Sequence, residues 1–239
     1  MSEKEIALVT GANKGIGFAI ADQLARRGMT VLVGARDRAR RADAVARLTG
    51  DVHGVELDVT DHGTVERAAK EVETRFGRLD VLVNNAGIVG ELPQTPGADP
   101  LPGVRQVFEV NVFGVIAVTE AMLPLLAPGA RVVNVSSSVG SLADMTARDG
   151  GHLAELPALL AYPVSKTALN AVTAQYAKYL RDRGILVNAV CPGYVATDLN
   201  GHDGGRGPDQ GAAIAVAMAT LGQDGPTATF TSEDGPVPW

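Results

Sequence analysis

Short apolar runs alternate with stretches of helical periodicity along the chain. Ile6–Thr10 is a continuous apolar run, the pattern of a strand covered on both faces. After a glycine-rich turn, Ile16, Ile20 and Leu24 recur at the spacing of one helix face, and Gly28 is a suitable helix stop. The same unit recurs further along. We predict strands at Thr30–Val33, Val52–Leu57, Val81–Val83, Arg131–Val135 and Ile185–Val190, and helices at Arg38–Leu48, Thr64–Phe76, from Gly103 to about Leu126, and at Leu159–Arg181.

This alternation predicts an α/β fold, a doubly wound, Rossmann-type parallel sheet with helices on both faces. The 239 residues are expected to form a single domain, 1–239. Three segments rich in glycine, proline or polar residues are predicted loops: Gly90–Gly103, Gly140–Pro157 and Asn200–Gly211. Ligands of such sheets bind beyond the carboxyl ends of the strands, so these loops are candidate substrate walls. The alternative is that they are ordinary surface loops.

A glycine-rich turn, TGANKGIG, joins the first strand to the first helix. Its glycines permit a sharp turn, a close backbone approach to a pyrophosphate, and close helix packing. The helix N-terminus then offers free N–H groups to phosphates. The spacing differs from the usual dinucleotide fingerprint, and a plain strand–helix turn is the alternative. The predicted cofactor contacts here are Gly11, Asn13, Lys14, Gly15, Ile16 and Gly17.

The end of the second strand indicates which dinucleotide is bound. An acidic residue at this place binds the ribose of NAD, whereas arginine accommodates a 2′-phosphate. Here Ala35 is followed by Arg36, and Lys14 supplies a second cation, so we predict NADP(H). The alternative is that Arg36 is a solvated residue at a helix start. Asp37 beside it is a predicted helix N-cap.

A tyrosine and a lysine, Tyr162 and Lys166, lie one helical turn apart on one face of the predicted helix Leu159–Arg181. An ammonium near a phenol lowers its pKa and makes it a usable general acid or base. Pro163 biases Tyr162 toward the helix start. A chance pair is the alternative.

Three serines, Ser136 to Ser138, follow the predicted strand Arg131–Val135 and face the predicted cleft. A hydroxyl group there can hold a carbonyl oxygen on which charge develops. For at least one of the three serines, turn formation is the alternative.

Together these residues resemble the short-chain dehydrogenase/reductase family, and within it the carbonyl reductases. The resemblance covers nearly the whole chain and rests on motifs in the family's order: TGANKGIG (Thr10–Gly17), Asp58, NNAG (Asn84–Gly87), Asn111, VSS (Val135–Ser137), YPVSK (Tyr162–Lys166) and CPGYVATD (Cys191–Asp198). It implies that Tyr162 is the acid/base, that Lys166 lowers its pKa and holds the nicotinamide ribose, and that Ser137 orients the carbonyl. It also implies that Asn111 holds a water linked to Lys166.

The resemblance implies further cofactor contacts. Asp58, with Val59 beside it, would contact the adenine, and Asn85 and Gly87 would line the ribose side. The segment after the last predicted strand would pass over the nicotinamide, through Pro192, Gly193, Val195 and Thr197. The implied function is the NADPH-dependent reduction of a ketone or aldehyde. The alternatives are a biosynthetic tailoring ketoreductase and a non-catalytic NADP-sensing protein.

One departure concerns the gap between Ser137 and Tyr162, which are 25 positions apart. This gap is wider than in many family members and narrower than in the animal carbonyl reductases. Because the longer insertion is associated with monomers, a monomer or a homodimer is expected. The insertion supplies candidate pocket residues: Asp144, Met145, His152 and Leu153.

Composition excludes several classes of protein. Hydrophobic residues make up 46% and charged residues 20%, which excludes a disordered chain. The net charge is −6, and the only dense basic cluster is Arg36, Arg38, Arg40 and Arg41, so no nucleic-acid partner is expected. The single cysteine, Cys191, excludes an internal disulfide framework, and no metal site is expected. With neither a signal peptide nor an 18-residue apolar run, we expect a cytoplasmic protein with a small-molecule carbonyl substrate and no membrane partner.

Overall fold

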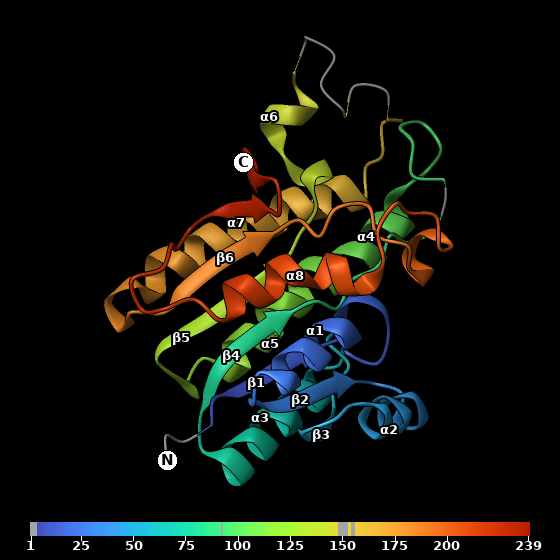
Figure 1. Cartoon of the computed structure of the whole chain (residues 1–239). Coiled ribbons are helices and arrows are strands. Elements are labelled where there is room, and N and C mark those ends of the chain that lie inside the picture. The colour runs from blue at the N-terminus through green and yellow to red at the C-terminus, as the bar shows by residue number, and fades with distance from the viewer. Residues whose placement is uncertain (1–3, 92, 148–152, 154–155) are drawn as a thin grey trace.

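The computed structural model describes residues 4–91, 93–147, 153 and 156–239. Within these residues, eight strands form one sheet in the order β3-β2-β1-β4-β5-β6-β7-β8 (Figure 1). All neighbouring strands are parallel except β7 and β8. The predicted doubly wound α/β fold is therefore confirmed. The strands are β1 (Ile6–Thr10), β2 (Thr30–Ala35), β3 (Asp51–Glu56), β4 (Leu79–Asn84), β5 (Leu126–Val135), β6 (Leu186–Val190), β7 (Phe230–Ser232) and β8 (Gly235–Pro236).

Helices cover both faces of this sheet (Figure 1). The helices of the described residues are α1 (Gly15–Arg26), α2 (Arg38–Arg47), α3 (His62–Phe76), α4 (Leu101–Phe108), α5 (Gly114–Met122), α6 (Leu142–Met145), which projects beyond the end of the sheet, α7 (Tyr162–Leu180) and α8 (Pro208–Ala219). A π-helical turn, η1 (Glu109–Phe113), joins α4 to α5, and short 3-10 turns lie at η2 (Ser138–Gly140), η3 (Arg181–Arg183) and η4 (Asp198–Asn200).

The core has two layers because successive side chains of a strand point to opposite faces. Val9 of β1 and Val33 of β2 pack with α1, α2 and α8 on one face. Leu8 and Leu32, their neighbours in sequence, pack with α3, α5 and α7 on the other. The continuous apolar runs that predicted buried strands reflect this double burial.

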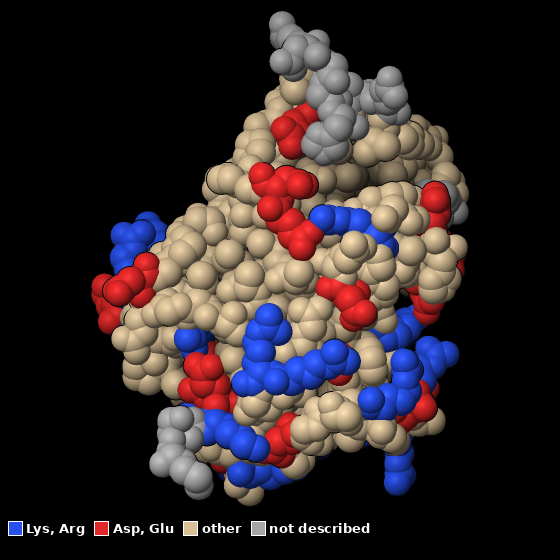
Figure 2. Space-filling model, in the orientation of Figure 1, with Lys and Arg blue, Asp and Glu red and all other residues tan. Residues whose placement is uncertain are grey.

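Polar side chains set the helix starts. The carboxylate of Asp37 accepts a hydrogen bond from the backbone N–H of Arg40 at 2.8 Å, which confirms Asp37 as an N-cap. This backbone hydrogen bond lowers the pKa of Asp37. Asp61 caps α3 in the same way, through the N–H of Thr64 at 3.2 Å. Figure 2 shows Lys and Arg side chains over the region of α2, with acidic side chains among them.

Several predicted boundaries are wrong, and prolines explain two of them. The helix predicted to reach Leu126 ends at Met122, because Pro124 cannot continue it, and β5 begins at Leu126 instead of Arg131. Helix α7 begins at Tyr162 and not at Leu159, because Pro163 favours the first turn.

Three predicted loops contain regular structure. Helix α6 lies within the predicted loop Gly140–Pro157, whose first residue ends the turn η2, and here the Ser141 hydroxyl accepts from the N–H of Asp144 at 3.1 Å. Helix α4 begins at Leu101, inside Gly90–Gly103. The predicted loop Asn200–Gly211 begins at the last residue of η4 and runs into α8, which begins at Pro208. The sequence prediction did not place α8, β7 or β8.

One helical run, Leu101–Met122, is long and apolar enough by length and composition alone to cross a membrane, with a mean hydropathy of 1.3. Core helices of soluble proteins pass the same test. Here Val107, Val118 and Met122 are completely buried inside the fold. The expectation of no membrane partner stays a prediction.

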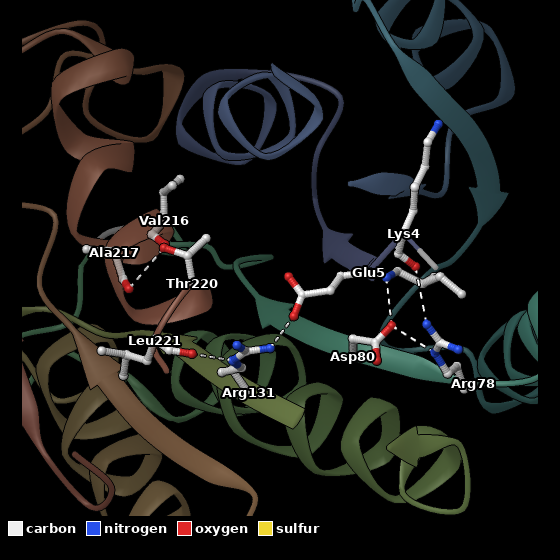
Figure 3. A network of polar contacts seen from close by, with 10 residues as sticks. Lys4, Glu5, Arg78, Asp80, Arg131, Val216, Ala217, Thr220 and Leu221 are labelled. Carbon is white, nitrogen blue, oxygen red and sulfur yellow. Dashed lines mark hydrogen bonds and ion pairs between the residues drawn. The ribbon is translucent and has the colours of Figure 1, made fainter. Parts of the chain in front are cut away.

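A polar network joins strands at the edge of the sheet opposite to the strand carboxyl ends (Figure 3). Arg131 of β5 donates to Glu5 at 2.6 Å and to the carbonyl oxygen of Leu221, beyond α8, at 2.7 Å. Asp80 of β4 accepts from the N–H of Ile6 at 2.8 Å and from Arg78 at 3.2 Å. The network therefore ties β1, β4, β5 and the end of α8 together.

Replacing Arg131 should destabilise the protein. The side chain is only 14% exposed, so Arg131→Ala leaves Glu5 and the Leu221 carbonyl without this partner. We expect the free energy of unfolding, measured by urea denaturation, to fall by roughly 1–3 kcal/mol. The control is Arg26→Ala, whose side chain is 70% exposed and pairs with Asp22 on the same helix, worth about 0.5 kcal/mol. Equal losses in both variants would contradict a structural role for the network.

Candidate functional site

The carboxyl ends of β1, β4, β5 and β6 bring together most of the residues that the sequence singled out. The glycine turn follows β1, and α1 begins at Gly15 within it. Gly11 and Gly15 have positive φ angles of 65° and 57°, which favour glycine. A Cβ at Gly17 would lie 2.6 Å from the carbonyl oxygen of Gly11 and would also collide with the amide of Asn85. The turn therefore requires its glycines, and the first N–H groups of α1 open onto it.

Asn85 holds this turn from the end of β4. Its Nδ2 donates to the carbonyl oxygen of Thr10 at 2.9 Å and to that of Gly11 at 3.4 Å. The Thr10 hydroxyl in turn accepts from the N–H groups of Asn85 and Ala86, both at 3.0 Å. The Asn85 amide thus fixes the glycine turn, a positioning role that the family resemblance did not supply.

The two predicted phosphate-binding cations each pair with a carboxylate. Lys14, at the N-cap of α1, forms an ion pair with Asp198 of η4. This contact lowers the pKa of Asp198, whose carboxylate also lies 2.8 Å from His202. Arg36 is 76% exposed and lies 3.8 Å from Asp58, beyond the ends of β2 and β3. Both cations are accessible to solvent, and in this structure each pairs with a carboxylate of the protein.

The predicted adenine contacts adjoin Arg36. The Asp58 carboxylate accepts from the N–H and the hydroxyl of Thr60, at 3.0 and 2.8 Å. Val59 packs so closely against α5 that a Cβ at Gly114 would lie 2.8 Å from it. The two hydrogen bonds from Thr60 thus fix the Asp58 carboxylate beside Arg36.

The segment after β6 crosses the glycine turn. The Thr197 methyl group would lie 3.5 Å from a Cβ at Gly15. Val195 is buried against Gly211 of α8, and Gly193 has a positive φ of 79° with Arg206 packed against it. The structure therefore brings Thr197 to the predicted phosphate-binding turn, and Pro192 lies between Gly193 and the buried Cys191.

Ser137, Tyr162 and Lys166 meet where β5 ends against α7. The Ser137 side chain lies close enough to the Tyr162 phenol to lower its pKa in part. The Lys166 ammonium lies over the Tyr162 ring, 5.5 Å from its centroid, and donates to the carbonyl oxygen of Val135 at 2.8 Å. The lysine is 4% exposed and the tyrosine is partly buried. The predicted convergence of the three groups is present.

The structure distinguishes Ser137 from its neighbours. The Ser136 hydroxyl is buried and donates to Asn170 of α7 at 2.6 Å. The backbone N–H of Ser138 donates to the Cys191 sulfur at 3.2 Å and begins the turn η2. Among these three serines, Ser137 is the one whose side chain affects the Tyr162 pKa, and its role in orienting the carbonyl stays a prediction.

Burial is the largest influence on the pKa values of both Tyr162 and Lys166. Burial raises the pKa of Tyr162 to about 12, and the hydrogen bond with Ser137 opposes this only in part. Burial also lowers the pKa of Lys166, to about 8. The Lys166 ammonium lies over the Tyr162 ring and donates to the Val135 carbonyl, and its role in lowering the phenol pKa stays a prediction. In this geometry the phenol is protonated at neutral pH.

Asn111 lies in η1, the π-helical turn that interrupts the helix between α4 and α5. It is completely buried, and its amide pairs with both backbone groups of Ile88, at 2.9 Å each. Its Nδ2 also donates to the Ser165 hydroxyl at 3.0 Å. Gly87 lies between the two polar tips: a Cβ there would lie 3.3 Å from Asn111 Oδ1 and 3.6 Å from Lys166 Nζ. Asn111 thus lies at the irregular turn of this helix, and its predicted role in holding a water stays a prediction.

Sequence reasoning missed Gly140, which the site requires. A Cβ at this position would lie 2.7 Å from the backbone carbon of Lys166. The signal available was a glycine three residues after Ser137. Of the candidate pocket residues, Asp144 and Met145 lie on α6, Leu153 is buried, and His152 lies outside the described residues. No group of three or more metal-ligating His, Cys, Asp or Glu side chains is found in the described part of the chain.

Known proteins with a similar sequence belong to a family of dehydrogenases. A family model described as short chain dehydrogenase matches residues 5–204. The chain belongs to the short-chain dehydrogenase family. Carbonyl reductase (NADPH) 1 of Bos taurus is 36% identical over an alignment of 275 positions, gaps included. The alignment covers 98% of this chain and 98% of that protein.

Solved structures of the short-chain dehydrogenase family have the same fold. The NADPH-bound carbonyl reductase from chicken fatty liver has a TM-score of 0.85 and 28% identity, with 100% of both chains covered. Salutaridine reductase from Papaver somniferum has a TM-score of 0.82 and 31% identity, covering 95% of this chain and 99% of that one. The similarity extends over the whole sheet and is not confined to the glycine turn.

The ionisation of Tyr162 can be measured directly. Because its pKa is raised to about 12, the tyrosinate absorbance of the wild type minus that of Tyr162→Phe should stay near zero up to about pH 10. Tyr179→Phe, at a side chain 70% exposed on the same helix, is the matched control for the loss of one tyrosine ring. A difference signal from Tyr162 that rises near neutral pH would support the sequence prediction that Lys166 lowers its pKa.

Proposed function

We propose that this protein reduces a ketone or aldehyde to an alcohol with NADPH. The observation that carries the proposal is the convergence of Ser137, a protonated Tyr162 and Lys166 at the end of β5. A non-catalytic NADP-sensing protein has no need of this arrangement. The relatives whose names include carbonyl reductase support the same chemistry.

The residues present fit a dinucleotide. The glycine turn has no room for side chains at Gly17, and the N-terminus of α1 opens there, as phosphate binding requires. Thr197 lies against Gly15 on the far side of the turn. Arg36 would hold the 2′-phosphate, and Lys14 could turn from Asp198 toward the phosphates, since both side chains are largely exposed. When bound, NADPH supplies the hydride for the carbonyl carbon.

The protein groups then bind and protonate the carbonyl oxygen. Ser137 and Tyr162, whose side chains lie next to each other, would both present hydroxyl groups to it. As charge develops on that oxygen, Tyr162 donates its phenol proton. Lys166, whose pKa is about 8, is largely cationic at neutral pH and stabilises the phenolate that remains. Asn111 fixes Ile88 and Ser165 beside this group.

The wider setting follows from the sequence. We propose that residues 1–239 form one domain, since one sheet runs from β3 to β8. A cytoplasmic location, a small-molecule partner, and a monomer or homodimer remain predictions. The tailoring ketoreductase differs from a general carbonyl reductase only in its pocket, so a broad substrate panel separates the two.

The first experiment is NADPH oxidation with a panel of diketones, quinones and aldehydes. In Tyr162→Phe the proton donor is absent, so kcat should fall by about 100-fold or more while NADPH still binds. Tyr179→Phe, an exposed tyrosine on the same helix, should keep wild-type activity. Undiminished turnover in Tyr162→Phe would contradict the proposed acid.

Arg36 should set the preference for NADPH. Loss of a charge-assisted contact to the 2′-phosphate costs roughly 1.5–3 kcal/mol, so Arg36→Ala should raise the KM for NADPH about 10- to 100-fold. The KM for NADH should change little, because NADH lacks that phosphate. Arg26→Ala, on the outer face of α1, serves as the charge-matched control. Equal effects on both cofactors would place Arg36 away from the 2′-phosphate.

A further inference from the structure

Gln94 is a completely buried polar residue in the segment between β4 and α4. Its Nε2 donates to the carbonyl oxygens of Val89 at 2.8 Å and Glu91 at 3.3 Å. Its Oε1 accepts from the backbone N–H of Tyr162 at 3.3 Å. Its own carbonyl oxygen accepts from the N–H of Leu160 at 3.0 Å. A single glutamine therefore joins the loop after β4 to the start of α7.

The start of α7 needs such a partner. Tyr162 is the first residue of the helix, so its N–H has no acceptor within the helix. Ala161 precedes it and has no side chain that could cap, and Pro163 follows it. Gln94 thus supplies from a distant segment the acceptor that a serine or aspartate N-cap would supply locally.

The carbonyl group of Tyr162 is held as well. It accepts from the Ser165 hydroxyl at 2.7 Å, and Ser165 in turn accepts from Asn111 at 3.0 Å. Asn111 also pairs with Ile88, the neighbour of the Val89 that Gln94 bonds. Both backbone groups of Tyr162 are therefore tied to one stretch of loop, through Gln94 on one side and through Ser165 and Asn111 on the other.

We propose that Gln94 is a positioning residue that fixes the backbone of Tyr162 and so aims its phenol at Ser137. The inference rests on the proposed reductase function, in which Tyr162 is the proton donor. A side chain at the first position of a helix turns with its backbone, so a loose N–H lets the phenol leave its contact with Ser137. Buried hydrogen bonds hold such geometry because an unsatisfied partner is costly.

Three variants separate positioning from general stability. Gln94→Met keeps a similar size and removes both the donor and the acceptor. Gln94→Glu keeps them, since burial favours a neutral carboxyl that can still accept from Tyr162 and donate to Val89. Gln106→Met makes the same change at an exposed glutamine on α4 and is the matched control. Should Gln94→Met fail to fold, Gln94→Asn keeps an amide that is too short to reach both partners.

Two measurements decide the proposal. In Gln94→Met, kcat should fall by roughly 10- to 100-fold with the KM for NADPH unchanged, because Gln94 bonds no residue of the glycine turn. The amide hydrogen of Tyr162 should exchange faster with solvent. Gln94→Glu should recover much of both losses, and Gln106→Met should show neither.

Contrary results are distinct from failure of the reductase function itself. An unchanged kcat, an unchanged Tyr162 amide exchange, or a rise in the KM for NADPH equal to the fall in kcat overturns the positioning role. If the wild type reduces no carbonyl of the panel, the proposed function fails. The exchange of the Tyr162 amide in Gln94→Met against Gln94→Glu then still decides whether Gln94 fixes this backbone.

Discussion

The close approach of the turn after β5 to the first half of α7 determines where the reactive groups stand. Gly140 lies so near the backbone of Lys166 that any side chain there would collide with it. The Gly140 carbonyl accepts from Thr167 at 2.9 Å, and Ser136 bonds Asn170 at 2.6 Å. With the strand end and the helix locked at this distance, Ser137 can contact Tyr162 while Lys166 reaches the Val135 carbonyl. A larger distance between the turn after β5 and α7 would keep Ser137 and the Val135 carbonyl out of reach of Tyr162 and Lys166.

A buried polar layer beneath the site supports this contact. Asn84 of β4 donates to Asn134 of β5 at 2.9 Å and to Thr119 of α5 at 3.1 Å, and Asn134 donates to Thr173 of α7 at 2.9 Å. Hydrogen bonds in a low-dielectric core are directional, and a shift in register would break several of them. The layer thus ties two strands to two helices. The one buried side-chain atom in the described residues that lacks a partner is Asn84 Oδ1, within this same layer.

The sequence predicted the fold because buried parallel strands and amphipathic helices leave local signals. It predicted Ser137, Tyr162 and Lys166 because motif order implies which strand ends meet. It did not reveal α8 as a helix, since small residues such as Ala212 and Ala215, buried on a helix, carry little periodic contrast. Gln94 and Gly140 were also missed. Their roles depend on which backbone groups approach them, and that depends on contacts between segments far apart in the chain.

The protonation of Tyr162 connects the packing to the direction of the chemistry. A phenol with a pKa near 12 is an available proton donor over the physiological range, which suits carbonyl reduction. Alcohol oxidation needs the opposite, a phenolate that accepts a proton. Burial favours the neutral phenol and also favours the neutral amine of Lys166, so the same desolvation stabilises the resting acid and weakens the cation beside it. A positive charge brought close to the phenol oxygen would favour the phenolate and lower the raised pKa of Tyr162.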